Sequence, residues 1–196
     1  MAMDIQYYCS APMYRVEEYE TEAELSEFIE ECVDVPRIRG YCMQCPRYSK
    51  VWSCPEHDFD PLLYWKLFSS LTLYLRKLIL PKELTDMTLT KEEQAMVVDA
   101  VFFRERKSFA GKLRALETDR SITLHVGHCD LCGVDDCARK DGLPCRHPKL
   151  KRFSMESLGA DVTKAAGKYF GETLQWNAPG KLPEYFMLVG GLLKAL

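Results

Sequence analysis

Seven of the nine cysteines in this chain fall in two short clusters, and these clusters restrict the possible fold more than any other feature. The first has the form C-x2-C-x8-C-P and the second the form C-x2-C-x4-C-x7-C. A C-x2-C pair places two thiols on one tight turn, where a disulfide between them would be strained. The same turn suits one metal ion or one edge of a cluster. The predicted ligands are Cys42, Cys45 and Cys54, and Cys129, Cys132, Cys137 and Cys145.

The surroundings expected for these thiols also favour metal over disulfides. The chain has 196 residues, is 47% hydrophobic and carries a net charge of -3. No apolar run is long enough to span a membrane, and the N-terminus lacks the pattern of a signal peptide. We therefore expect a cytoplasmic protein with no membrane partner. Thiols stay reduced in the cytoplasm, so closely spaced cysteines are expected to bind metal there.

The spacing of the second cluster bears on which metal is bound. Four cysteines can hold either a tetrahedral zinc ion or a [4Fe–4S] cluster. Structural zinc usually takes two C-x2-4-C pairs, whereas this cluster has one pair followed by two single cysteines. We therefore favour iron–sulfur, and zinc remains open because Cys132-Gly133 is also a common zinc-knuckle turn.

The first cluster has three cysteines and leaves its fourth ligand undecided. The pair Cys54-Pro55 is like the Cys-Pro that closes bacterial ferredoxin motifs. His57 could complete a Cys3His zinc site. Without His57, the cluster could hold a [4Fe–4S] centre with one iron open to a substrate. Cys9 or Cys32 could also supply a thiolate, and the two clusters could share one site.

Basic residues are concentrated in the second cluster and after it. They can stabilise the negative charge of a thiolate-bound metal or dock an acidic redox partner. No aromatic residues are interleaved with them, so binding of nucleic acid is not expected. His125 and His128 lie just before the cluster and could donate hydrogen bonds to sulfur. The basic residues are Arg139, Lys140, Arg146, Lys149, Lys151 and Arg152.

Capping signals predict where the helices begin. The tetrapeptides starting at Thr21 and Thr90 have the form of capping boxes. Asp60-Pro61 predicts a helix with Asp60 as N-cap. Ser154 and Asp161 are expected to cap two later helices. We expect the first helix to end at Pro36, and the helix from Thr90 to be the longest, reaching about Leu116.

Apolar spacing predicts which side of each helix is buried. The expected buried positions, in chain order, are Leu25, Phe28, Ile29 and Cys32; Leu62, Leu63, Trp65 and Leu67; Met96, Ala100, Phe103, Ala110 and Leu113; and Val162, Ala165, Ala166, Tyr169 and Phe170.

Alternating apolar residues predict the strands. Strands are expected at Leu71–Leu80, at Ile122–Val126, and at Tyr185–Val189 before Gly190-Gly191. The first fifteen residues are expected to be strand or loop. Together the elements predict a mixed α/β (α+β) fold: a single-domain sandwich over 1–196, with a small mixed sheet, flanking helices and cysteine-rich metal loops at about 41–60 and 127–153.

Several of these segments together resemble a prokaryotic family, the "predicted metal-binding protein" family (domain of unknown function 2284). The resemblance implies metal binding by the seven cysteines, as iron–sulfur, in largely anaerobic microbes. Relatives usually have Cys-Pro-Pro where this chain has Cys54-Pro55-Glu56. The segments are Cys42-x2-Cys45-Pro46-x-Tyr48, Trp52-Ser53-Cys54-Pro55, Cys129-x2-Cys132-x4-Cys137, Pro144-Cys145-Arg146-x-Pro148, and Arg152-Phe153-Ser154-Met155-Glu156-x-x-Gly159.

The sequence thus favours an iron–sulfur protein with a redox, electron-transfer or accessory role and one or two [4Fe–4S] clusters. Two alternatives remain. One is a zinc-stabilised binding module, and the other is an enzyme that binds substrate at the open iron of the three-cysteine cluster. No nucleotide-binding or hydrolase motif is present to identify catalytic residues.

Overall fold

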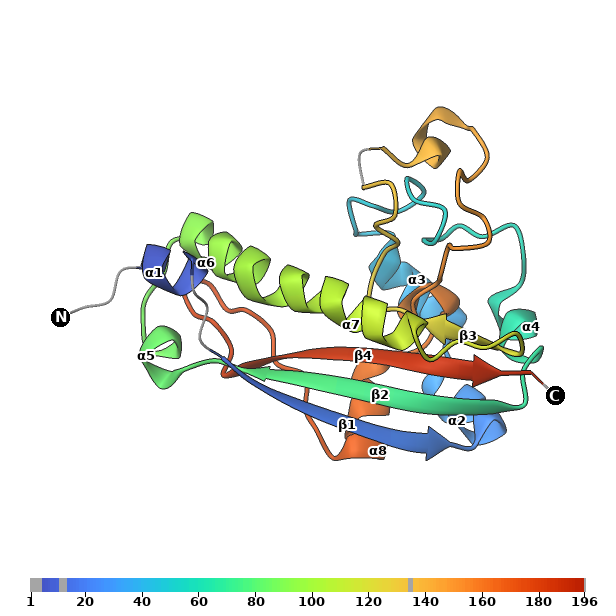
Figure 1. The fold of residues 1–196 in the computed structure, drawn as a ribbon, viewed down its shortest axis with the longest axis horizontal. Helices are drawn as coiled ribbons and strands as arrows, with labels where there is room; N and C mark the ends of the chain where they lie inside the picture. The colour runs from blue at the N-terminus through green and yellow to red at the C-terminus, as the bar shows by residue number, and fades with distance from the viewer. Residues whose placement is uncertain (1–4, 11–13, 134–135, 196) are drawn as a thin grey trace.

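A four-stranded antiparallel sheet in the order β1-β2-β4-β3 forms the centre of the molecule (Figure 1). The computed structural model describes residues 5–10, 14–133 and 136–195. The two central strands are long and contact each other along their whole length. The strands are β1 (Arg15–Ala23), β2 (Ser70–Ile79), β3 (Ser121–Leu124) and β4 (Tyr185–Lys194).

Helices cover both faces of the sheet. In Figure 1 the long helix formed by α6, η1 and α7 crosses one face, while α2 and α8 lie on the other. The helices are α1 (Ile5–Ser10), α2 (Leu25–Cys32), α3 (Val35–Cys42), α4 (Pro61–Trp65), α5 (Lys82–Thr85), α6 (Lys91–Val98), the π-helical turn η1 (Asp99–Phe103), α7 (Arg104–Arg114), the 3-10 turns η2 (Ala138–Asp141) and η3 (Glu156–Leu158), and α8 (Val162–Phe170).

Each face of the sheet has its own hydrophobic core, because side chains alternate between the faces of a strand. Leu71, Leu73 and Leu75 of β2 pack against α2 and α8. Leu78 of the same strand packs on the opposite side, with Phe109 and others of the long helix. The predicted mixed α/β (α+β) class is therefore confirmed, but the pairings among the four strands are all antiparallel, so the sheet is not mixed as expected. No helix in the described part of the chain has the length and apolar character needed to cross a membrane.

The elements with strong local signals lie where the sequence predicts them. Asp60 caps α4 through the N–H of Leu62 at 2.8 Å, and Asp161 caps α8 through that of Lys164 at 3.0 Å. Thr90 and Glu93 form the predicted capping box. The strands predicted in the middle of the chain are β2 and β3. The last strand, β4, continues through Gly190-Gly191 instead of stopping before them.

Four predictions in the first third of the chain are wrong. Residues 5–10 form a helix, in which Ile5 and Tyr8 are buried in the second core. β1 runs through Thr21, so Glu24 caps α2 in its place. Pro36 lies in the first turn of α3, where proline fits, and does not end a helix. Of the leucines expected in the core around α4, Leu62, Leu63 and Leu67 are 37%, 60% and 67% exposed, because α4 ends at Trp65 after little more than one turn.

The buried side of the long helix matches the prediction only in part, because Leu113 is buried as expected while the other predicted positions are not. The π-helical turn η1 interrupts the α-helical period between α6 and α7. Val97, Val101, Phe109 and Leu113 are buried, whereas Met96 is 42% exposed. Ser154 accepts a hydrogen bond from the N–H of Ser157, but the element it begins is the short 3-10 turn η3 and not an α-helix.

Candidate metal centres

The three cysteines of the first cluster line one cavity of about 190 Å³. Cys42 is the last residue of α3, and Cys45 follows on a turn in which its N–H donates to the Cys42 carbonyl at 2.9 Å. Cys54 comes from the loop that returns toward α4. The opposite wall of the cavity is formed by residues from far along the chain. The remaining lining residues are Arg47, Tyr48, Pro55, Gly127, His128, Ser154, Glu156 and Ser157.

The four cysteines of the second cluster line a separate, smaller cavity of about 20 Å³. Cys129 follows the end of β3, and Gly133 turns the chain after Cys132 with φ +74°, a conformation that suits glycine. Residues 134 and 135, inside this cluster, lie outside the described ranges. Val51, Trp52 and Ser53 of the first loop form part of the wall. The structure therefore groups the seven cysteines as four and three, beside one another.

Direct hydrogen bonds join the two cysteine loops. The Cys129 N–H donates to the buried hydroxyl of Ser53 at 2.8 Å. The Trp52 indole N–H donates to the Leu143 carbonyl at 2.9 Å. Arg139 donates to the carbonyls of Val51 and Cys54 at 2.9 and 2.6 Å, and also to that of Glu56. Each loop therefore donates hydrogen bonds to the other, and these bonds hold the two loops together.

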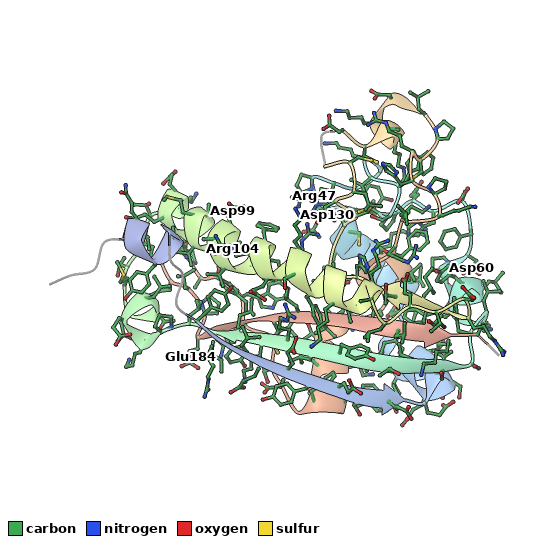
Figure 2. The ribbon with its side chains drawn as sticks, in the orientation of Figure 1. Arg47, Asp60, Asp99, Arg104, Asp130 and Glu184 are labelled. Carbon is green, nitrogen blue, oxygen red and sulfur yellow. The ribbon has the colours of Figure 1, made fainter. Side chains whose placement is uncertain are left out.

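Arg106 of α7 anchors the second loop to the body of the protein. Its guanidinium donates to the carbonyls of Val126 and His128 at 3.3 and 2.9 Å and to the Asp130 carboxylate at 3.2 Å. Figure 2 shows Asp130 next to Arg47 of the first loop, at the junction between the loops and the helix. Arg106 thus fixes the backbone just before the second cluster.

Burial keeps two thiols of the first cluster, those of Cys42 and Cys54, protonated when no metal is bound. It raises the pKa of Cys42 to about 11. It also raises the pKa of Cys54 to about 11, against a smaller opposing effect of a hydrogen bond from Ser53. Burial raises the pKa of Cys129 as well. Because metals bind the thiolate, binding at these sites would release protons.

The histidines have distinct positions. The Nε2 atom of His57 lies 2.9 Å from the Ser157 carbonyl oxygen, and its ring stacks on Phe59, so His57 does not line the three-cysteine cavity. His128 does line it, and burial lowers the pKa of His128 to about 4, which leaves its imidazole neutral. His125, just after β3, is buried and forms an isolated bridge with Ser154, and burial lowers its pKa to about 4.

The two cysteines outside the clusters lie elsewhere. Cys32 is 1% exposed in the first hydrophobic core. Cys9 lines a different cavity beside α6 and η1. Neither is grouped with the first cluster, so the structure offers no support for either as its fourth thiolate.

The donor chemistry of both cavities fits a thiophilic metal. Within the described residues, no three His, Cys, Asp or Glu side chains are placed closely enough around one point to hold a metal ion. The thiols thus line their cavities without meeting at a common centre. Glu156 lines the larger cavity and also another cavity beside Phe186, and its carboxylate oxygen Oε2 is buried without a hydrogen-bond partner among the described residues. Such an atom is expected where a cation binds.

Sequence reasoning found the seven cysteines but missed the residues that complete the walls. Glu156, Arg47 and Ser53 carry no metal motif of their own. Glu156 and Ser53 do fall within segments that resemble the metal-binding family, and this was the signal that could have found them. The basic residues Arg139 and Arg152 bind backbone carbonyls and a carboxylate in this protein, so part of the basic run is structural.

A family model described as "Predicted metal-binding protein (DUF2284)" matches residues 29–193, and the chain therefore belongs to this family. The match includes both cysteine clusters. No curated protein and no solved structure matches the chain.

Proposed function

We propose, starting from this membership in a family of predicted metal-binding proteins, that the chain is a cytoplasmic iron–sulfur protein with two [4Fe–4S] sites and a role in electron transfer. Cys129, Cys132, Cys137 and Cys145 would hold one cluster. Cys42, Cys45 and Cys54 would hold three irons of the other. The observation that carries the proposal is the division of seven thiols between two adjacent cavities.

The surroundings of the two sites suit electron transfer. The loops are tied together through Ser53, Trp52 and Arg139, so two clusters would be held at a fixed separation. Backbone N–H groups and cations near the sulfurs stabilise a reduced cluster and raise its potential. When bound, the clusters supply one-electron redox chemistry, and the chain supplies the ligands, the hydrogen bonds and the exclusion of water.

We also propose an acidic redox protein as partner. Lys140, Arg146 and Lys149 of the second loop are exposed. Among them lie Leu143 and Leu150, which are 56% and 49% exposed. A cationic surface with apolar side chains beside a redox site is well suited to a transient complex with an acidic protein.

The test is metal analysis of the full chain purified without oxygen. We expect iron and acid-labile sulfide, with broad visible absorption that bleaches in air. Cys145→Ser and Cys54→Ser should each remove about four irons per chain, one cluster each. Cys9→Ser, outside both clusters, is the matched control and should retain all the iron. A colourless protein without iron would contradict the proposal.

Zinc is the second candidate, and one observation favours it. The four-cysteine cavity of about 20 Å³ is closer in size to a single ion than to a cuboidal cluster. In that case the second loop would be a zinc-stabilised module that binds a partner. Stoichiometric zinc with no acid-labile sulfide in the same analysis would establish it.

A further inference from the structure

Glu156 occupies a fixed position in the wall of the three-cysteine cavity. It begins the 3-10 turn η3, which two serines brace from either side. The Ser157 N–H donates to the Ser154 hydroxyl at 3.1 Å, and the Ser154 N–H donates to the Ser157 hydroxyl at 3.2 Å. α3, which ends in Cys42, docks on the same turn through the hydrogen bond from Asp34 N–H to the Gly159 carbonyl at 2.9 Å.

This docking brings the carboxylate close to the first cysteine. Gly159 has φ +89°, and a Cβ atom there would lie 2.7 Å from the Cα of Val35, the first residue of α3. The start of α3 can approach the turn only because residue 159 has no side chain. Cys42, at the other end of α3, lines the same cavity as Glu156.

One oxygen of this carboxylate is left without a partner. Glu156 Oε2 is buried and has no hydrogen-bond partner among the described residues. Burial raises the pKa of Glu156, and hydrogen bonds from its own N–H and from the Ser154 hydroxyl oppose this only in part. Buried carboxylates are normally paired with a cation or bound to a metal, since an unpaired one is costly. Here Glu156, whose Oε2 atom is uncompensated, lines the cavity with the three thiols and also lines a second cavity beside Phe186.

We propose that Glu156 is the fourth protein ligand of the metal centre held by Cys42, Cys45 and Cys54. The assignment rests on the proposed function and completes a Cys3Glu set. Carboxylate oxygen is an accepted ligand of both iron and zinc. Binding forms one coordinate bond from Oε2 to the metal, and any proton on the carboxyl group leaves to solvent.

Two other residues compete for this role. His57 lies outside the cavity and its Nε2 atom is within hydrogen-bond distance of the Ser157 carbonyl. His128 lines the cavity, but neither of its ring nitrogens is buried without a partner in the described structure. The uncompensated oxygen therefore distinguishes Glu156 from both histidines.

The test compares Glu156→Gln and Glu156→Ala with His128→Gln in full chain purified without oxygen. The exposed Glu83→Gln is the matched control for loss of one carboxylate. We expect both Glu156 variants to lose about one iron per chain from the three-cysteine site, while sulfide is kept and a [3Fe–4S] electron paramagnetic resonance signal appears. His128→Gln and Glu83→Gln should keep the wild-type iron content and spectrum. Far-ultraviolet circular dichroism verifies that each variant is folded.

The outcomes separate this assignment from the proposed function. Iron content and spectra unchanged in both Glu156 variants would overturn the ligand role while leaving the iron–sulfur proposal intact. Loss of iron in His128→Gln alone would assign the ligand to the histidine instead. A wild-type chain that holds zinc and no iron would refute the cluster proposal. In that case Glu156→Gln should lose the zinc bound by the three cysteines, and retention of this zinc would overturn the Glu156 assignment.

Discussion

An ion pair at the base of the second cysteine loop offers a quantitative test of how this loop is held. Arg152 ends the loop and binds Glu117 through two hydrogen bonds, of 2.5 and 2.6 Å. Glu117 also accepts hydrogen bonds from the N–H and hydroxyl of Thr123 in β3, at 2.8 and 2.5 Å. The Glu117 side chain is only 13% exposed, so solvent screens the pair weakly. Glu117→Gln removes the charge and keeps the shape.

The pKa of Glu117 gives the expected magnitude. Burial alone would raise it, but the hydrogen bonds from Arg152 and Thr123 outweigh burial and lower the pKa from 4.5 to about 2. At 1.36 kcal/mol per pKa unit, this shift corresponds to about 3 kcal/mol of stability. Because the folded pKa is below the unfolded one, the stabilisation is complete above pH 4.5 and is lost as pH falls toward 2. The loss is about 1 kcal/mol at pH 4 and about 2 kcal/mol at pH 3.

The assay is denaturant unfolding of wild type and Glu117→Gln between pH 7 and pH 3. Wild type should be more stable at pH 7, and its advantage should narrow by these amounts as the pH falls. Subtracting one protein from the other cancels acid release of metal, which affects both. Glu30→Gln, an exposed carboxylate on α2, is the control and should show no such narrowing. A difference that stays constant from pH 6 to pH 3 would refute the reasoning.

Two further substitutions test the packing of the sheet and the joining of the loops. Gly190→Ala should cost about 1–3 kcal/mol by overpacking, because its Cβ would lie 2.5 Å from Leu113 Cδ1 and 2.9 Å from the Leu124 carbonyl oxygen. Gly111→Ala, with open space around it, should be neutral or stabilising in the same urea titration, and equal effects would contradict the packing argument. Arg139→Met should leave three loop carbonyls without their donor, at about 1–3 kcal/mol for each buried one, and speed loss of metal from both sites to a chelator. Lys140→Met, which changes the exposed neighbouring residue, is the control. Faster loss of metal from only one of the two sites would argue against Arg139 as a shared anchor.

The sequence predicted those elements whose signals are local. Asp60-Pro61 and the capping box at Thr90 each contain, within four residues, the groups that satisfy a helix start, so no distant contact is needed. The strand around Leu71–Leu80 was also clear from its alternation. The box at Thr21 failed because a strand pairing outweighed it: Thr21 lies opposite Leu73 of β2 in a ladder that runs the whole length of β1. Pairing with a distant strand leaves no mark on the local sequence.

The candidate sites divide in the same way. Thiols are rare and chemically specific, so the clusters containing Cys42 and Cys129 were found from spacing alone. Their separation into two cavities depends on where β3 and α3 end in space, which the sequence left open. Glu156 was missed because an ordinary glutamate becomes unusual only when the fold buries one of its oxygens without a partner, and nothing in the local sequence shows that.

The basic residues of the second loop show why charge alone was ambiguous. Arg139 and Arg152 act as multiple hydrogen-bond donors: one binds carbonyls of the first loop, and the other binds Glu117. A guanidinium can make several such bonds at fixed angles, whereas a lysine ammonium cannot reproduce that geometry. Lys140, Arg146 and Lys149 are the exposed members of the basic run, and they form the surface proposed above to dock an acidic protein. The anchoring arginines therefore hold the loops, and only the exposed cations could contribute to the proposed partner surface.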